Sequence, residues 1–191
     1  MMRKEIRISG FGGQGVVLVG YILGKALAIY AKYEAVMTQA YGPEARGGAS
    51  SANIVISDEP IDYPFVLNPD ILVALSQEGY NRFRPSIRKN GLILIDDGLV
   101  KPKENDDIYG IPATRIAEEL GRRVVTNVVM LGFLTALIGL VPRESVEKAI
   151  ESSIRKKLVP LNLNAFESGY EYAYQNLSPR EVQVIKNVIT G

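Results

Sequence analysis

The sequence contains neither cysteine nor histidine among its 191 residues. The missing cysteine excludes disulfides, thiolate-held iron–sulfur clusters and cysteine-based structural zinc. The missing histidine removes the most common general base and the most common metal ligand of proteins. Because Ser–His–Asp and Cys–His arrangements each need one of these residues, neither is possible here. We therefore expect neither a catalytic residue nor a metal site in this chain.

A surplus of charge of either sign is also missing. The formal net charge is +1, whereas proteins that bind nucleic acid usually carry a clear basic surplus. Apolar residues make up 47% and charged residues 23% of the chain, which is ordinary for a globular protein. We therefore expect no nucleic-acid partner and a single domain spanning residues 1–191.

Long hydrophobic runs are scarce, and the main candidate is the mostly apolar stretch 124–141. A membrane-spanning helix needs about 20 apolar residues, so this stretch lies at the lower limit. It is interpreted either as a spanning helix or as a helix buried in a core or subunit interface, and we prefer the buried helix. The N-terminus runs directly into a strand-like segment without the apolar core of a signal peptide. We therefore expect a cytoplasmic protein with no membrane partner.

Short apolar or β-branched segments predict the strands of one sheet. Several of them do not alternate between apolar and polar residues, which is typical of strands covered by helices on both faces. The expected strands are 4–9, 34–39, 52–56, 71–75, 92–95 and 107–111.

Helices are expected between and after these strands. Apolar residues recur at three- and four-residue steps over 16–30 and place one apolar face on a helix. The first strand, a glycine turn and this helix form a Rossmann-like βαβ opening. We predict a three-layer α/β/α fold with a mostly parallel sheet and a helical C-terminal part. The expected C-terminal helices are 113–120, 126–140, 143–157, 165–176 and 180–188.

The turn after the first strand is rich in glycine and reads Gly10-Phe11-Gly12-Gly13-Gln14-Gly15. Its spacing allows a tight turn and a close approach of a ligand, and the N–H groups at the start of the next helix favour an anion. A dinucleotide site also needs an acidic residue at the end of the second strand. Glu34 instead begins that strand, which argues against plain dinucleotide binding.

A second glycine-containing loop places Arg46 before Gly47 and Gly48. Functionally, the Arg46 guanidinium offers a two-pronged donor to a carboxylate or phosphate, while the glycines let a ligand approach the backbone. In the structural interpretation, Arg46 pairs with Glu44 or caps a carbonyl oxygen, and the glycines only form a turn. The residues by themselves leave both interpretations open.

Two further clusters have structural as well as functional interpretations. Asp96 and Asp97 follow an expected strand and could bind Mg²⁺, although such pairs more often form a turn. Tyr170, Tyr172 and Tyr174 alternate within an expected helix, where packing against a partner is favoured over base stacking.

Several segments together carry a resemblance to a known family. Gly10–Val16 and Tyr41–Gly48, with Asn127–Gly132 and Asn162–Tyr170, closely resemble the γ subunit of 2-oxoacid:ferredoxin oxidoreductases. The resemblance covers nearly the whole chain, and the Arg46 loop is its most specific part. The Pro43–Gly48 form of this loop is most similar to the 2-oxoglutarate or branched-chain 2-oxoacid branch.

The resemblance implies a complex that decarboxylates a 2-oxoacid, forms an acyl-coenzyme A and passes electrons to ferredoxin. Thiamine diphosphate, Mg²⁺ and iron–sulfur clusters would lie on the α, β and ferredoxin-like δ subunits. The γ subunit would help to assemble the complex and would be inactive alone. When it is isolated we expect a homo-oligomer, because the helix 126–140 and the tyrosine-rich segment 170–174 are too apolar for a free surface. The candidate residues for the approach of coenzyme A, or of its phosphates, are Gly10, Gly12, Gly13, Gln14, Gly15, Arg46, Gly47 and Gly48. The alternative is a stand-alone Rossmann-like module that binds a nucleotide or another phosphate ligand.

Overall fold

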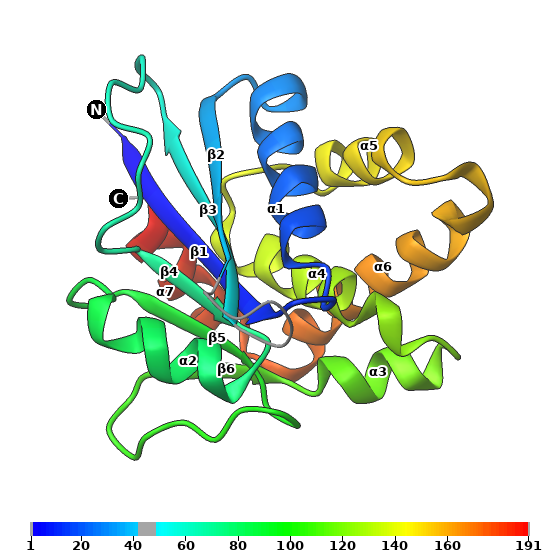
Figure 1. Ribbon diagram of the computed structural model, residues 1–191. Helices are drawn as coiled ribbons and strands as arrows, with labels where there is room; N and C mark the ends of the chain where they lie inside the picture. Colours follow the sequence, from blue (N-terminus) through cyan, green and yellow to red (C-terminus); the bar gives the residue numbers. More distant parts are fainter. Residues whose placement is uncertain (1, 42–48, 191) are drawn as a thin grey trace.

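The computed structural model describes residues 2–41 and 49–190, and a six-stranded sheet lies at its centre (Figure 1). The strand order is β2-β3-β1-β4-β5-β6. Within the described residues, β3 is the one strand that runs opposite to the other five. The strands are β1 (Arg3–Phe11), β2 (Glu34–Ala40), β3 (Ala49–Ser57), β4 (Ile71–Ala74), β5 (Leu92–Asp96) and β6 (Ile108–Ile111).

Helices cover both faces of this sheet, but unequally. The larger apolar core joins one face of the sheet to α1 and α3–α7, whereas a smaller core joins the other face to α2 (Figure 1). The helices are α1 (Val16–Lys25), α2 (Gln77–Phe83), α3 (Ala113–Glu119), α4 (Thr126–Ile138), α5 (Arg143–Ser153), α6 (Val159–Asn176) and α7 (Pro179–Thr190). The predicted α/β class, the mostly parallel sheet and the helical C-terminal part are confirmed.

The opening βαβ arrangement differs in one respect from a simple pair of neighbouring parallel strands. β1 and β2 run in the same direction, but β3 lies between them and is antiparallel to both. All nine residues of β3 are buried, because β3 pairs along both edges and is covered on both faces. The sequence predicted a strand at 52–56 but carried no information about its direction.

Several helices differ from the prediction, among them α5, which ends at Ser153 rather than near Lys157. The short α2 was not predicted, because its seven residues include Gly79 and show little apolar periodicity. Its start is set by Ser76, whose hydroxyl oxygen accepts a hydrogen bond from the Gly79 N–H at 3.1 Å. In addition, α6 begins at Val159 rather than Ala165.

Helix α4 accounts for the apolar stretch that raised the question of a membrane span. Every residue from Asn127 to Ile138 is buried, and α4 packs against α1, α3, α6 and α7 within the chain. Over residues 2–41 and 49–190, no helix combines the length and apolarity that a membrane span requires. The interpretation as a buried helix is confirmed, so this helix provides no support for the expected homo-oligomer.

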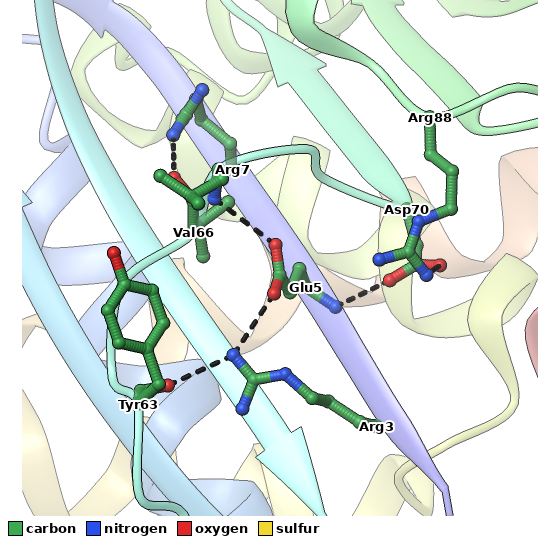
Figure 2. Close-up of polar contacts among 8 residues, drawn as sticks. Arg3, Glu5, Arg7, Tyr63, Val66, Asp70 and Arg88 are labelled. Carbon is green, nitrogen blue, oxygen red and sulfur yellow. Dashed lines mark hydrogen bonds and ion pairs between the residues drawn. The ribbon is translucent and has the colours of Figure 1, made fainter.

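The face of the sheet beneath α2 is charged where β1 crosses it. Arg3, Glu5 and Arg7 alternate along β1 and reach the segment that joins β3 to β4 (Figure 2). Arg3 donates to the carbonyl oxygen of Tyr63 at 3.0 Å, and Arg7 donates to that of Val66 at 2.5 Å. These side chains therefore attach the connecting segment to the sheet through its backbone.

Asp106 holds a second connecting segment against the same face. Its carboxylate accepts hydrogen bonds from Arg84, with 2.8 Å between Arg84 Nε and Asp106 Oδ2, and from the Tyr80 hydroxyl. The Arg84 hydrogen bond lowers the pKa of Asp106 below its ordinary 3.8, against the opposing effect of burial. The interaction therefore stabilises the fold above pH 3.8, and its contribution is lost as the pH falls through the lower folded pKa.

We expect Asp106→Asn to lower the free energy of unfolding at pH 7, because the neutral amide loses the charge-assisted bond to Arg84. The difference from the unmodified protein should shrink as the pH falls below 3.8 and passes through the lowered folded pKa, because the carboxylate itself then becomes protonated. Urea unfolding at pH 7 and at a pH below the folded pKa measures this, with the exposed neighbour Asp107→Asn as the control. An equal loss at both pH values would contradict the role of the Asp106 charge.

Candidate functional site

The carboxyl ends of β1 and β4 form a point where the chain leaves the sheet in two directions. The two strands are parallel neighbours, with Ser9 beside Ala74 and the Leu75 N–H donating to the Ser9 carbonyl oxygen at 2.8 Å. After β1 the chain enters α1 on one face, and after β4 it enters α2 on the other (Figure 1). In α/β proteins ligands bind in the crevice at such a switch point, which makes this edge the candidate site.

The predicted glycine turn lies at this switch point. Gly10 and Phe11 end β1, and Gly15 precedes α1 in a left-handed conformation with φ 70°. No side chain caps the start of α1, and its first turn contains no acidic residue. The N–H groups at this end of the helix therefore suit an anion.

The glycines of the turn have two different roles. A Cβ on Gly10 would lie 2.5 Å from Gln14 Oε1, and a Cβ on Gly15 would lie 2.2 Å from Asn127 Nδ2. Added Cβ atoms on Gly12 and Gly13 would meet no atom within 4 Å. Gly10 and Gly15 thus make room for protein side chains, whereas Gly12 and Gly13 present open backbone.

Asn127, at the start of α4, supports the turn from the larger core. Its Nδ2 donates to the carbonyl oxygen of Gly15 at 3.1 Å, and the residue is buried. Asn127 lies in one of the segments that carry the family resemblance, but the sequence indicated no role for it. Only the structure brings it together with Gly15, which lies 112 positions away in the chain.

A largely apolar cavity of about 320 Å³ borders the turn. Leu18, Val124 and Leu158 line it together with Gly13, and Arg155 adds one positive charge. The apolar wall and the open N–H groups of α1 lie side by side. Such a site can accept a ligand that has a phosphate and an apolar arm.

The second predicted loop lies outside the described residues, and with it Arg46, Gly47 and Gly48. The first described residue after it is Ala49, which pairs with Phe11 in the register of β1 and β3. The Ala49 N–H also donates to Glu78 Oε1, at 3.3 Å, from the first turn of α2. The chain therefore leaves the second loop directly beside the glycine turn.

The paired acids after β5 serve the fold. Asp96 is fully buried, and its carboxylate accepts hydrogen bonds from the Thr114 N–H at 3.0 Å and from the Gly98 N–H at 3.2 Å. Burial, together with the neighbouring Asp96 charge, raises the pKa of Asp97. Among the residues that the structure describes, no three acidic side chains are grouped closely enough to hold a metal ion.

The three tyrosines of α6 do not share one face, since Tyr170 and Tyr174 are neighbours and Tyr172 points to α4. Tyr172 packs edge-on against Phe133 of α4 with 5.9 Å between the ring centroids. Tyr170 lies 5.4 Å from Tyr174, and burial raises the pKa of Tyr170 to about 12. Tyr174 is 47% exposed, so it is the member of this group that is open to a partner.

Comparison with known proteins places the chain among oxidoreductase subunits. Residues 5–172 match the family described as pyruvate ferredoxin/flavodoxin oxidoreductase. The 2-oxoglutarate synthase subunit KorC of Methanocaldococcus jannaschii is 55% identical over 177 residues, which cover 90% of this chain and 95% of the relative.

Solved structures agree with this result. The keto/oxoacid ferredoxin oxidoreductase γ subunit of Geobacter sulfurreducens has a TM-score of 0.83 at 38% identity, with 92% of this chain and 98% of that chain covered. A 2-oxoglutarate:ferredoxin oxidoreductase of Magnetococcus marinus, solved with 2-oxoglutarate, coenzyme A and succinyl-CoA, has a TM-score of 0.84 at 23% identity. The match covers 93% of this chain but 32% of that one, and at this identity it shows a shared fold.

Proposed function

This chain belongs to the pyruvate ferredoxin/flavodoxin oxidoreductase family, and we propose that it is the γ subunit of a 2-oxoglutarate:ferredoxin oxidoreductase. The observation that carries the proposal is the 55% identity to a 2-oxoglutarate synthase subunit over nearly the full length of both chains. The assembled enzyme decarboxylates 2-oxoglutarate, transfers the acyl group to coenzyme A and passes the electrons to ferredoxin. We place the complex in the cytoplasm and treat residues 1–191 as one domain.

The side chains that could act as ligands indicate which cofactors of the complex this chain does not bind. Iron–sulfur clusters are held mainly by cysteine thiolates, and the sequence has no cysteine. The Gly-Asp-Gly…Asn motif expected of a thiamine diphosphate site is also missing, and its nearest approach, Asp96-Asp97-Gly98, is occupied by turn and cap contacts. We therefore assign thiamine diphosphate, Mg²⁺ and the clusters to the α, β and δ subunits.

The work that remains for this chain is to complete the complex and to shape the approach of coenzyme A. We propose that the open backbone of the glycine turn, at the start of α1, faces a phosphate of coenzyme A. Arg46 would supply the guanidinium, with Gly47 and Gly48 beside it. Chain connectivity supports their joint action, since three residues span at most about 11 Å and Ala49 pairs with Phe11.

We expect Arg46→Ala to raise the KM for coenzyme A about tenfold in the assembled complex, because a charge-assisted hydrogen bond to phosphate is lost. The KM for 2-oxoglutarate should stay the same, since that substrate reacts on the thiamine-bearing subunits. Arg115→Ala removes an exposed arginine of α3 and serves as the control. An unchanged KM for coenzyme A would show that Arg46 does not contribute to coenzyme A binding.

The alternative of a stand-alone nucleotide-binding module is not favoured by the family match or by the missing acidic residue at the end of β2, where the strand ends in Gln39 and Ala40. Purification of the chain from its native host distinguishes the two functions. The proposed function requires thiamine- and cluster-bearing subunits to co-purify with it. A chain that purified alone and bound NAD tightly would support the alternative.

A further inference from the structure

The carboxamide of Gln14 is engaged at both ends by backbone. Its Oε1 accepts a hydrogen bond from the Phe11 N–H at 2.6 Å, and its Nε2 donates to the Leu75 carbonyl oxygen at 2.9 Å. Phe11 ends β1 and Leu75 directly follows β4. One side chain thus ties together the two strand ends that form the switch point, and we call these two hydrogen bonds the Gln14 clamp.

The clamp acts on the part of the turn that has the greatest conformational freedom. Gly12 and Gly13 follow Phe11 directly, and glycine populates both signs of φ about equally in a free chain. Gly13 has a φ of 95°. A backbone hydrogen bond from the Gln14 N–H to the Phe11 carbonyl oxygen, at 3.1 Å, closes the same turn.

The missing side chain of Gly10 leaves room for the Gln14 carboxamide. A Cβ at this position would lie 2.5 Å from Gln14 Oε1 and 3.2 Å from the Cβ of Leu75. Any side chain at position 10 would therefore push the carboxamide out of its place between the two strands. Gly10 and Gln14 therefore act together. Because Gly10 has no side chain, the Gln14 carboxamide can reach the backbone of both strand ends.

We propose that Gln14 is a positioning residue, which holds the Gly12–Gly13 backbone in the orientation that receives a phosphate of coenzyme A. This inference rests on the proposed function. It also changes the role of Gln14 and Gly10, which the sequence placed among residues that approach the ligand. The turn is thereby divided into two ligand-facing glycines, Gly12 and Gly13, and the residues that hold them.

A direct contact between the Gln14 amide and the ligand is less consistent with this geometry. To turn toward a ligand the carboxamide would have to give up hydrogen bonds to two backbone groups at the strand ends. Such a rotation would exchange two hydrogen bonds within the protein for contact with the ligand. The fixed amide instead orders the open backbone before the ligand arrives, which lowers the entropic cost of binding.

The test compares Gln14→Ala, Gly10→Ala and Gly12→Ala in the assembled complex. The first two each release the clamp, so each should raise the KM for coenzyme A about tenfold, with kcat at saturating coenzyme A and the KM for 2-oxoglutarate unchanged. The double variant should be no worse than either single one, because both changes remove the same interaction. Gly12→Ala, whose Cβ meets open space in the free chain, should raise the same KM through a clash with the ligand.

A matched control comes from α2, where Gln77 makes an equivalent pair of bonds. Its Oε1 accepts from the Lys101 N–H at 2.7 Å, and its Nε2 donates to the Lys101 carbonyl oxygen at 3.3 Å. Gln77→Ala therefore removes a similar clamp from a different loop. It should leave the KM for coenzyme A unchanged.

Hydrogen exchange of residues 10–15 in the complex gives a readout that does not depend on coenzyme A. Faster exchange in Gln14→Ala, together with the raised KM, supports the inference. Unchanged hydrogen exchange in Gln14→Ala overturns the inference. It is also overturned if Gly12→Ala and Arg46→Ala raise the KM for coenzyme A but Gln14→Ala does not. If exchange accelerates but no variant shifts the KM, coenzyme A does not approach this edge, and the proposed role of the turn fails together with the inference.

Discussion

Gly132→Ala is expected to destabilise the chain by at least about 4 kcal/mol or to prevent folding. A Cβ on Gly132 of α4 would lie 1.9 Å from the carbonyl oxygen of Phe166 in α6. The reciprocal contact is equally close, since a Cβ on Gly169 of α6 would lie 1.8 Å from the Val129 carbonyl oxygen. Both clashes are with backbone, so no side chain can rotate away, and the two helices would have to separate.

The loss is measured by guanidinium unfolding of the purified chain or, if the variant does not fold, by its yield of soluble protein. Gly24→Ala is the matched control, because its Cβ would make only ordinary contact with Met37 at 3.9 Å. That change should stabilise α1 by about 0.5 to 1 kcal/mol. A Gly132 variant as stable as the Gly24 variant would show that α4 and α6 cross less closely than described.

The second large effect is expected for Arg7→Ala, with a loss of about 3 kcal/mol. The Arg7 guanidinium donates to the Val66 carbonyl oxygen (Figure 2). It also donates to Asn53 Oδ1 at 2.7 Å and to Ser86 Oγ at 3.2 Å, and it lies over the Phe83 ring. It therefore links β1 to three other parts of the chain. Its removal leaves buried acceptors without partners, which costs more than the bonds themselves contribute.

Chemical unfolding measures this loss, and Arg3→Ala two positions earlier is the control. The Arg3 side chain is 28% exposed and pairs with Glu5 at 3.0 Å. Such a partly solvated pair contributes about 0.2 to 1 kcal/mol. Equal losses for Arg3 and Arg7 would mean that the charge of β1, rather than the buried network of Arg7, stabilises this face.

Patterns local in the chain predicted most of the elements. β4 and the first four residues of β5 are apolar, and both strands are buried throughout, as their lack of alternation indicated. α7 begins at Pro179, one residue before the predicted start at 180, and the Ser178 hydroxyl donates to Glu181 Oε2 at 2.6 Å. Burial on both faces and helix capping depend on residues within a few positions of one another, which is why the sequence contains this information.

The candidate site was predicted only in part. The glycine turn was located correctly, and its place at the carboxyl end of β1 followed from the strand–turn–helix pattern. The sequence did not separate Gly10 and Gly15 from Gly12 and Gly13, because the distinction depends on Gln14, Leu75 and Asn127. The ligand role of the turn, like that of Arg46, stays a prediction.

The sequence by itself determined the class of the fold, the order of its elements and the family to which the chain belongs. It also determined that this chain offers no thiolate ligand for an iron–sulfur cluster, since that conclusion needs only the absence of cysteine. The tertiary structure alone decided the direction and place of β3, the close crossing of Gly132 and Gly169, and the contact of Gln14 with β4. Each of these joins residues distant in the chain, and local propensity and periodicity carry no information about which distant segments meet.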